Sequence, residues 1–356
     1  MSDSLALQGV GAQDAARRGW IHSPGFDLSF FILSPLAGFA LAILGVQYSL
    51  ALPAVLIGAS YMIGVPHYLA SFAFFLGDEN RAHARRFWPL FYVGPLLICI
   101  GVVALYTMQA AHVVFAALFV WNVYHVATQS SGILSLYRRL SGGGVRERLL
   151  AHRTILLANA AMAFWFIDRF PPLWDPLVGV HPGLPDLLRA GFLIGALGYG
   201  VAYAWEIGRR PFPLSAAEIS CLVTGILIFT PYLWVEDSNL ATVAMLTGHF
   251  IQYLAIVWLL NRRKYEGSDP ARGQRWLARM SESWKPVVLF MLIVGMLFYA
   301  LDRGSRVLQV ITVFYAFFNA LALVHFYIDG LIWAFRNPYI RRTVGPFLTL
   351  EGHRIR

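Results

Sequence analysis

Long apolar runs dominate this chain and restrict it to a membrane fold. A helix needs about 20 mainly apolar residues to cross a ~30 Å hydrocarbon core at ~1.5 Å per residue. These runs are continuous and do not alternate apolar with polar residues, which argues against a membrane barrel. The sequence therefore predicts an all-α, polytopic transmembrane helix bundle of about ten spans, at 28–46, 51–76, 87–107, 109–137, 149–167, 188–207, 216–235, 240–261, 286–301 and 306–335.

The composition supports a membrane protein. Of 356 residues, 58% are hydrophobic and only 13% are charged, whereas soluble domains carry about 25% charged residues. The predicted organisation is a cytoplasmic N-terminal segment at 1–27, a transmembrane bundle at 28–335 and a basic cytoplasmic tail at 336–356. No internal repeat is evident in the sequence, and no linker divides the bundle.

Basic residues are distributed unevenly between the two sides of the predicted bundle. If the N-terminus is cytoplasmic, 24 of the 28 basic residues face the cytoplasm, and only Arg169, Arg189, Arg303 and Arg306 lie outside. This positive-inside asymmetry predicts that both termini are on the cytoplasmic side of a bacterial inner membrane. The basic surface, which includes segment 270–285, then faces anionic headgroups of the lipid bilayer. The net charge of +9 is thus explained without a nucleic-acid partner.

Six of the ten histidines fall inside predicted spans, where ionisable side chains are costly and are candidates for function. His112 and His152 lie near the ends of their spans. The other four lie in the second, fourth, eighth and tenth spans, which all cross in the same direction, at 9, 12, 12 and 10 residues from the inner ends. These depths agree within ~5 Å. We therefore expect four imidazoles to converge on one centre: His67, His125, His249 and His325.

Each of these histidines has a polar side chain near it at helical spacing, and Ser71 lies one turn after His67. Gln129 lies one turn after His125, Gln252 and Tyr253 lie one turn after His249, and Asp329 lies one turn after His325. A metal-ligating histidine needs its second ring nitrogen held by a carboxylate or amide, and these residues are suited to that role. Asp329 is the only carboxylate deep inside a span. It is a candidate catalytic residue, either as a direct ligand or as a partner of an imidazole.

The residue types restrict the metal and the substrate. No sulfur ligand lies at this depth, and imidazole with a carboxylate suits non-haem iron first, then zinc, copper or manganese. Haem b is an alternative, because two histidines can supply both axial ligands. Many aromatic residues lie near the proposed centre, and core packing and lipid contacts account for most of them. If some line a cavity beside the metal, the substrate is a lipophilic small molecule, and its oxidation would require dioxygen and an electron-donor protein.

Two alternatives follow from the same residues. Intramembrane histidines and Asp329 can form a proton relay in a proton-coupled or small-solute transporter, although no paired broken helices or inverted repeat support this. The histidines can also be hydrogen-bonding residues between helices, in a structural subunit of a larger membrane complex. The metal content of the purified protein separates the metalloprotein from both alternatives.

The sequence GVPHYLAS around His67 resembles the Gly-x-Pro-His motif of the Brp/Blh family of bacterial membrane carotenoid oxygenases. The resemblance implies a multi-helix bundle in which histidine-bound iron cleaves a polyene to retinal, with His67 as an iron ligand. It covers about eight residues. The acidic residue expected shortly after the histidine is absent, and Leu69, Ala70 and Ser71 stand there instead.

Overall fold

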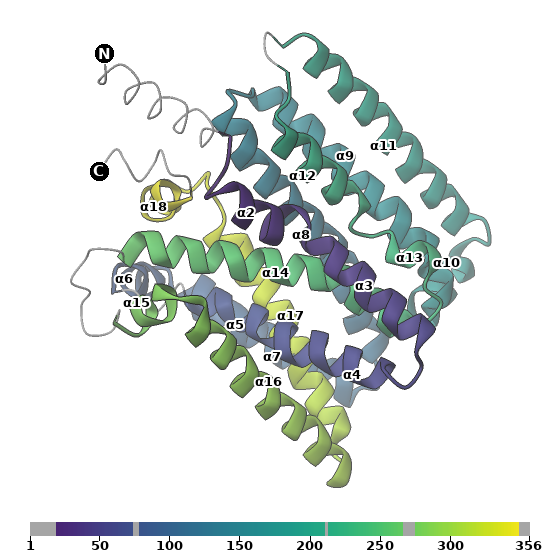
Figure 1. The fold of residues 1–356 in the computed structure, drawn as a ribbon. Coiled ribbons are helices and arrows are strands. Elements are labelled where there is room, and N and C mark those ends of the chain that lie inside the picture. The colour runs from purple at the N-terminus through teal and green to yellow at the C-terminus, as the bar shows by residue number, and fades with distance from the viewer. Residues whose placement is uncertain (1–18, 74–77, 211–212, 266–274, 349–356) are drawn as a thin grey trace, which may run out of the picture.

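The computed structural model describes residues 19–73, 78–210, 213–265 and 275–348, and all regular structure within these ranges is helical (Figure 1). Eight helices in the described part are long and apolar enough to cross a membrane, and a ninth span results if a pair of helices bent by 47°, Pro24–Ile32 and Ser34–Gln47, is counted as one. The eight are Leu52–Ala73, Pro89–Thr107, Ala111–Leu140, Leu184–Gly208, Ala216–Trp234, Ser238–Tyr265, Trp284–Val307 and Ile311–Ile332. The predicted all-helical membrane bundle is confirmed at this level.

The remaining predicted span, 149–167, coincides with helix α9 (Val145–Trp165), which does not reach the same apolarity. Basic and polar residues, including Arg148, Arg153 and Asn159, interrupt its apolar sequence. The ninth predicted span was too short, because helix α16 runs over Trp284–Val307 rather than 286–301. The count of ten and the sidedness of the termini stay predictions, and residues 1–18 and 349–356 lie outside the described ranges.

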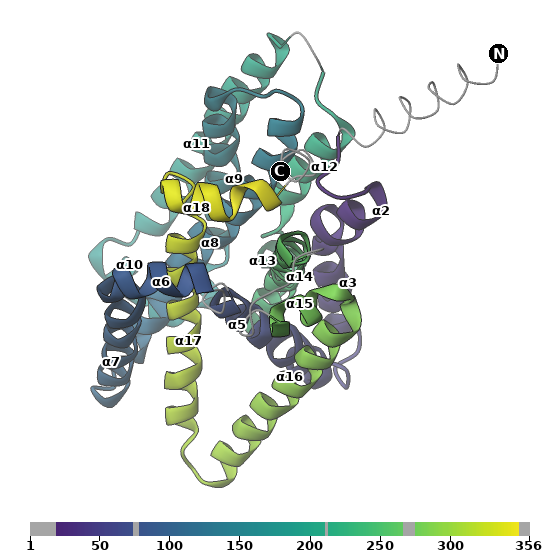
Figure 2. The same cartoon turned by 90° about the vertical axis from the view of Figure 1, so that its left-hand side faces the viewer.

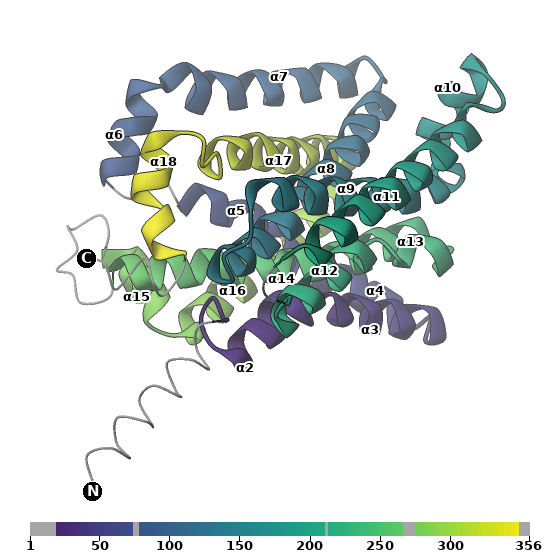
Figure 3. The same ribbon diagram turned by 90° about the horizontal axis from the view of Figure 1, so that it is seen from above.

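Four inner helices form a closed ring. They are α5 (Val65–Ala73), α8 (Ala111–Leu140), α14 (Ser238–Tyr265) and α17 (Ile311–Ile332). Helix α5 contacts α14 and α17, and α8 contacts the same two helices. Figures 1 and 3 show α14 and α17 crossing the middle of the bundle, and in the ring they lie opposite each other, with α5 and α8 between them. Each of the four carries one of the predicted histidines.

Each inner helix is preceded in the chain by an outer helix, and we call these two consecutive helices a pair. The outer helix of one pair packs most closely on the inner helix of a different pair. Helix α3 (Ser34–Gln47) packs on α14, α12 (Ala216–Leu227) on α8, and α7 (Gly94–Thr107) on α17. Helix α16 packs on α5 and on the π-helical segment η2 (Gly58–Gly64) that precedes α5. A pattern of one outer and one inner helix therefore occurs four times around the ring, a repeat that the sequence analysis did not find.

Two of these helix pairs share the same connecting turn. Gln109 and Gln309 both adopt φ 58°, in turns where the next residue, Ala110 or Val310, donates its N–H to the carbonyl five residues back, at 2.8 Å in both cases. His125 and His325 each follow the turn glutamine by 16 residues (125 − 109 and 325 − 309). Equal turns and equal spacing place the two histidines at the same height in the bundle.

Small residues let the central helix α14 approach α3. A Cβ atom on Gly38 would lie 2.0 Å from the carbonyl oxygen of Ala244, and one on Gly248 would lie 2.7 Å from Cα of Pro35. Such close approach is the usual means of packing helices in a membrane. It fixes the position of the residue that follows Gly248, His249. Helix α14 is the most buried candidate span, with 72% of its apolar window inside the protein.

The inner helices end where three short helices, α6 (Asp78–Arg86), α15 (Arg275–Glu282) and α18 (Pro338–Thr343), gather (Figures 1 and 3). We call this the basic end, because arginines and lysine concentrate there, at Arg81, Arg85, Arg86, Arg262, Arg263, Lys264, Arg275, Arg279, Arg341 and Arg342. Helix α15 covers half of segment 270–285, which is predicted to follow the membrane surface, and residues 266–274 lie outside the described ranges. The α7–α8 and α16–α17 turns lie at the opposite end, which we call the turn end (Figure 2).

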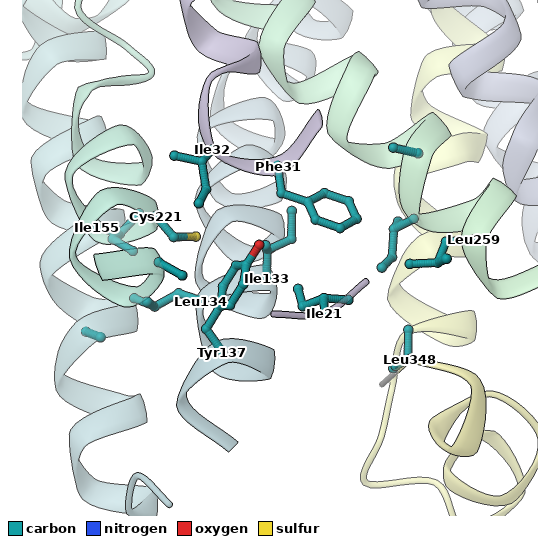
Figure 4. Close-up of a cluster of buried hydrophobic side chains, with 14 of the residues drawn as sticks. Ile21, Phe31, Ile32, Ile133, Leu134, Tyr137, Ile155, Cys221, Leu259 and Leu348 are labelled. Carbon is teal, nitrogen blue, oxygen red and sulfur yellow. The ribbon is translucent and has the colours of Figure 1, made fainter. Parts of the chain in front are cut away.

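A cluster of buried apolar side chains joins the helices near the basic end (Figure 4). Within it the Tyr137 hydroxyl donates to Asp27 Oδ2 at 3.1 Å. The Asp27 carboxylate also accepts the backbone N–H groups of Ile21 and His22, at 2.6 and 3.0 Å. Because these bonds satisfy a buried charge, they anchor the first described turn of the chain to α8.

Candidate metal centre

The four predicted histidines come together in the middle of the helix ring. One ring nitrogen from each of His67, His125, His249 and His325 lies within 4.8 Å of those of the other three. The imidazole centroids of histidines on contacting inner helices are 4.4–5.1 Å apart. Those of His67 and His125, which lie diagonally across the group, are 6.4 Å apart. We call this arrangement the histidine square. The convergence predicted from equal depth is confirmed.

The histidine square leaves six buried ring nitrogens without a hydrogen-bond partner. They are both nitrogens of His67, both of His249, and Nε2 of His125 and of His325. The exposed fraction is 0% for His67 and His325, 1% for His249 and 9% for His125. A buried polar atom left unpaired costs about 1–3 kcal/mol. A metal ion is a partner that several imidazole nitrogens can share, so this donor set fits a bound transition-metal ion.

Asp329 contacts the histidine square through a serine. Its Oδ1 accepts hydrogen bonds from the Ser71 and Tyr253 hydroxyls, both at 2.6 Å. Ser71 Oγ also lies 2.7 Å from Nδ1 of His325. The predicted pairing of Asp329 with His325 is therefore bridged by Ser71, one turn after His67.

The other carboxylate oxygen of Asp329 faces two imidazoles. Oδ2 lies 3.9 Å from Nε2 of His125 and 3.8 Å from Nε2 of His325. These distances are too long for hydrogen bonds. Two atoms that bind one ion at ~2.0–2.2 Å can lie up to about 4.2 Å apart. The position of Oδ2 thus suits a further ligand to an ion held by the histidines.

The two predicted glutamines support the backbone rather than the imidazoles. Gln129 donates to the carbonyl oxygen of His249 at 2.9 Å and to Gln252 Oε1 at 3.3 Å. Gln252 donates to the carbonyl oxygen of Phe31 at 2.8 Å. The expectation that these amides hold the ring nitrogens of His125 and His249 is therefore wrong. Each amide points across the helix interface to a backbone acceptor and ties α8, α14 and the first helix together.

Tyr253 occupies a more central place than the sequence indicated. Besides the bond to Asp329, its hydroxyl lies 2.7 Å from Ser71 Oγ and accepts the indole N–H of Trp333 at 3.3 Å. The sequence predicted Ser71 as a polar neighbour of His67 but did not indicate Trp333 as a site residue. Trp333 stands one turn after Asp329, and this spacing was the available signal for it.

The histidine square has two unlike sides. The residues one turn after the four histidines, toward the basic end, are all polar, and we call this the polar side: Ser71, Gln129, Tyr253 and Asp329. The residues one turn before, toward the turn end, are apolar or aromatic, and we call this the apolar side: Ile63, Trp121, Met245 and Leu321. Because all four inner helices run in the same direction, the two sides face opposite ends of the bundle (Figure 1).

The remaining intramembrane histidines lie elsewhere. His112 is exposed, and Nδ1 of His152 lies 2.8 Å from Ser131 Oγ. Among the aromatic residues predicted near the centre, Phe250 and Phe326 lie against the rings of His67 and His125, with centroids 4.7 and 4.6 Å apart. Two further aromatic residues predicted near the centre, Phe74 and Phe75, lie outside the described ranges.

A second buried polar cluster lies where α8, α9, α11 (Leu184–Gly208) and α12 meet near the basic end, and we call it the arginine–glutamate cluster. Glu147 pairs with Arg138 and, at 2.6 Å, with Arg210, which also pairs with Glu218 at 3.4 Å. Burial alone would raise the pKa of Glu147, but its bonds to Arg210, Gly144 N–H and Arg138 hold that pKa below its ordinary value. The opposite charges here neutralise one another.

No protein-family model, no curated protein and no solved structure matches this chain. The fold and the site together define an all-helical membrane protein with four histidines gathered in its core. These four buried imidazoles are close enough to bind one metal ion.

Proposed function

We propose that the protein is an integral membrane metalloprotein whose histidine square binds one non-haem iron ion, and that it oxidises a lipophilic substrate. The observation that carries the proposal is the set of six buried ring nitrogens without hydrogen-bond partners. Histidines that served only to join helices would bond to one another or to neighbouring polar groups. Instead, the four rings gather around one point.

The donor set supports iron over the other candidates. Cys99 and Cys221 belong to apolar clusters away from the centre, so the donors are imidazoles and the Asp329 carboxylate. Iron, zinc, copper and manganese accept such donors, but zinc has no redox chemistry of its own. Four rings that meet within 4.8 Å leave no plane for a macrocycle between two of them, which favours a bare ion over haem b.

The residues of the chain have distinct parts in this proposal. Iron with open coordination positions, when bound, supplies the binding and activation of dioxygen. The four imidazoles hold the ion, and Ser71, by accepting the Nδ1 proton of His325, directs Nε2 of that ring toward the centre. Ser71 and Tyr253 orient Asp329. The surrounding helices exclude bulk water from the reacting groups.

The proposed substrate is an apolar molecule that enters from the bilayer. Apolar side chains border the histidine square toward the turn end, and the resemblance of GVPHYLAS to the Brp/Blh motif favours a polyene. We place the protein in a bacterial inner membrane, with the basic end and both termini on the cytoplasmic side. An electron-donor protein would bind on that side.

Metal analysis of detergent-purified protein tests the proposal. We expect about one iron per chain in the native protein, loss of the metal in the His249→Ala variant, and full metal in the matched His112→Ala variant, because His112 is an exposed span histidine outside the square. Cleavage or oxidation of carotenoids in membranes tests the substrate. Native protein without metal, or equal metal in the two variants, contradicts the metalloprotein and leaves a transporter or structural subunit.

A further inference from the structure

A small cavity lies on the polar side of the histidine square. Its volume is about 30 Å³, and residues of α5, α6, α14, α17 and α18 line it. Tyr253, whose ring centroid lies 4.5 Å from that of His67, borders the cavity, as does Trp333. Side chains from the basic end border it as well, namely Asn80, Asn261, Lys264 and Thr343.

The size of the cavity determines what it can hold. One water molecule needs about 10–15 Å³ of such volume, so about two can be accommodated. Pockets for lipophilic ligands are ten or more times larger, at about 300–1,000 Å³. An acyl chain or polyene therefore does not fit here, although Ala70, Val257, Leu260 and Ile332 give the cavity partly apolar walls.

Only one layer of side chains separates the cavity from the histidine square. Tyr253 borders the cavity, and its hydroxyl donates to Asp329 Oδ1 at 2.6 Å. Asp329 Oδ2 in turn lies 3.8–3.9 Å from two of the ring nitrogens. On the apolar side, Ile63, Leu246 and Leu321 pack into an apolar cluster.

We propose that this cavity is a water-filled vestibule through which water reaches the centre from the basic end, while the apolar side stays dry. The inference rests on the proposed function in one respect, because the centre it serves is the proposed metal site. It adds that water and substrate approach from opposite sides of the histidine square. Water supplied behind Tyr253 and Asp329 would provide the exchangeable protons that reduction of dioxygen consumes.

Exchange of cysteine S–H groups in D₂O, followed by infrared spectroscopy, tests the vestibule. Two cysteines are introduced singly on α14 in a chain with Cys99→Ala and Cys221→Ala: Val257→Cys in the cavity wall and Leu246→Cys on the apolar side. Both parent residues are half-buried, which makes the pair matched. We expect S–H exchange at least about 10-fold faster in the Val257→Cys variant. Addition of Ala70→Leu, which fills the cavity, should remove most of this difference.

Equal exchange rates in the two variants, or a rate unaffected by Ala70→Leu, would overturn the vestibule. An Ala54→Leu variant, at an exposed position of the same span as Ala70, controls for a general effect of the added bulk. The exchange measurement requires no metal. Fast exchange behind Tyr253 in a protein that binds no metal would therefore contradict the proposed function and leave the vestibule standing.

Discussion

The histidine square and the arginine–glutamate cluster are both buried, polar and built from several helices, but they differ in how their groups are paired. In the arginine–glutamate cluster two carboxylates face two guanidinium groups, and only Arg138 Nε and Arg210 Nη2 lack a hydrogen bond. In the histidine square six ring nitrogens lack one. A cluster that satisfies its own charges stabilises the fold, whereas one that leaves its donors unpaired is built for a ligand.

The largest effect we expect is the loss of metal binding when one member of the square is replaced. His249→Leu removes a donor and puts an apolar side chain in its place, so metal affinity should fall by at least about 1,000-fold, or ~4 kcal/mol. Metal titration with spectroscopic detection measures this. His152→Leu is a matched control because His152 lies outside the square, and an equal loss there would contradict the assignment.

The second prediction concerns the arginine–glutamate cluster, where we expect a substitution to lower stability and to leave metal binding unchanged. Glu147→Gln leaves Arg138 and Arg210 without their shared counter-charge, which should destabilise the protein by about 3 kcal/mol without changing metal affinity. Glu206→Gln is the control, because the exposed pair of Glu206 with Arg146, at 3.6 Å, is worth less than about 1 kcal/mol. Thermal unfolding in detergent measures both.

The comparison fails if the metal-free His249→Leu variant is destabilised as much as the Glu147→Gln variant. Removal of two unpaired buried nitrogens should leave the metal-free protein equally stable or more stable. A loss of about 3 kcal/mol on this substitution would indicate that His249 contributes to the fold without a metal.

The third prediction is smaller and concerns the carboxylate beside the square. Asp329→Asn keeps the shape of the side chain but removes its charge and replaces Oδ2, the oxygen that faces His125 and His325, with an amide nitrogen. Metal affinity should fall by about 10–100-fold. Tyr253→Phe, which removes one of the two bonds to Oδ1, should have an effect in the same direction but smaller. Unchanged metal affinity in the Asp329→Asn variant would exclude Asp329 from the site.

Sequence spacing could predict the depth of the histidines but not the partners around them. His67, His125, His249 and His325 share a level because helix length and direction are determined by apolar runs and charge asymmetry, both of which are local properties. The neighbours depend on which helices pack together. Each outer helix packs on an inner helix from another pair, and no local pattern determines that choice.

Because the sequence does not determine which helices pack together, some partners predicted for the histidines were wrong. Gln129 and Gln252 were assigned to imidazoles of their own helices from helical spacing, but each bonds to a backbone carbonyl on another helix. Ser71 bridges α5 to α17, a contact between residues 258 positions apart in the chain. The repeated pairing of outer and inner helices was invisible because its copies differ in sequence, apart from the turn glutamines and the histidines.

The smallest effect we expect is the pH dependence of the arginine–glutamate cluster. Because the pKa of Glu147 is lowered in the folded protein, its stabilising contribution is complete above 4.5, the ordinary pKa, and is lost as the pH falls through the lower folded value. The loss amounts to ~1.4 kcal/mol for each unit of difference between the two pKa values. The stability gap between the native protein and the Glu147→Gln variant should therefore narrow below about pH 4.5.

Unfolding of the metal-free protein between pH 7 and pH 3, with a chelator present, measures this gap. The four core histidines are the same in both proteins, so their protonation cancels in the difference. The Glu206→Gln variant should follow the native protein throughout, because its pair is mostly exposed. A gap that stays constant to pH 3 would mean that Glu147 stabilises the cluster through shape and hydrogen bonding, and that charge pairing is not what separates this cluster from the histidine square.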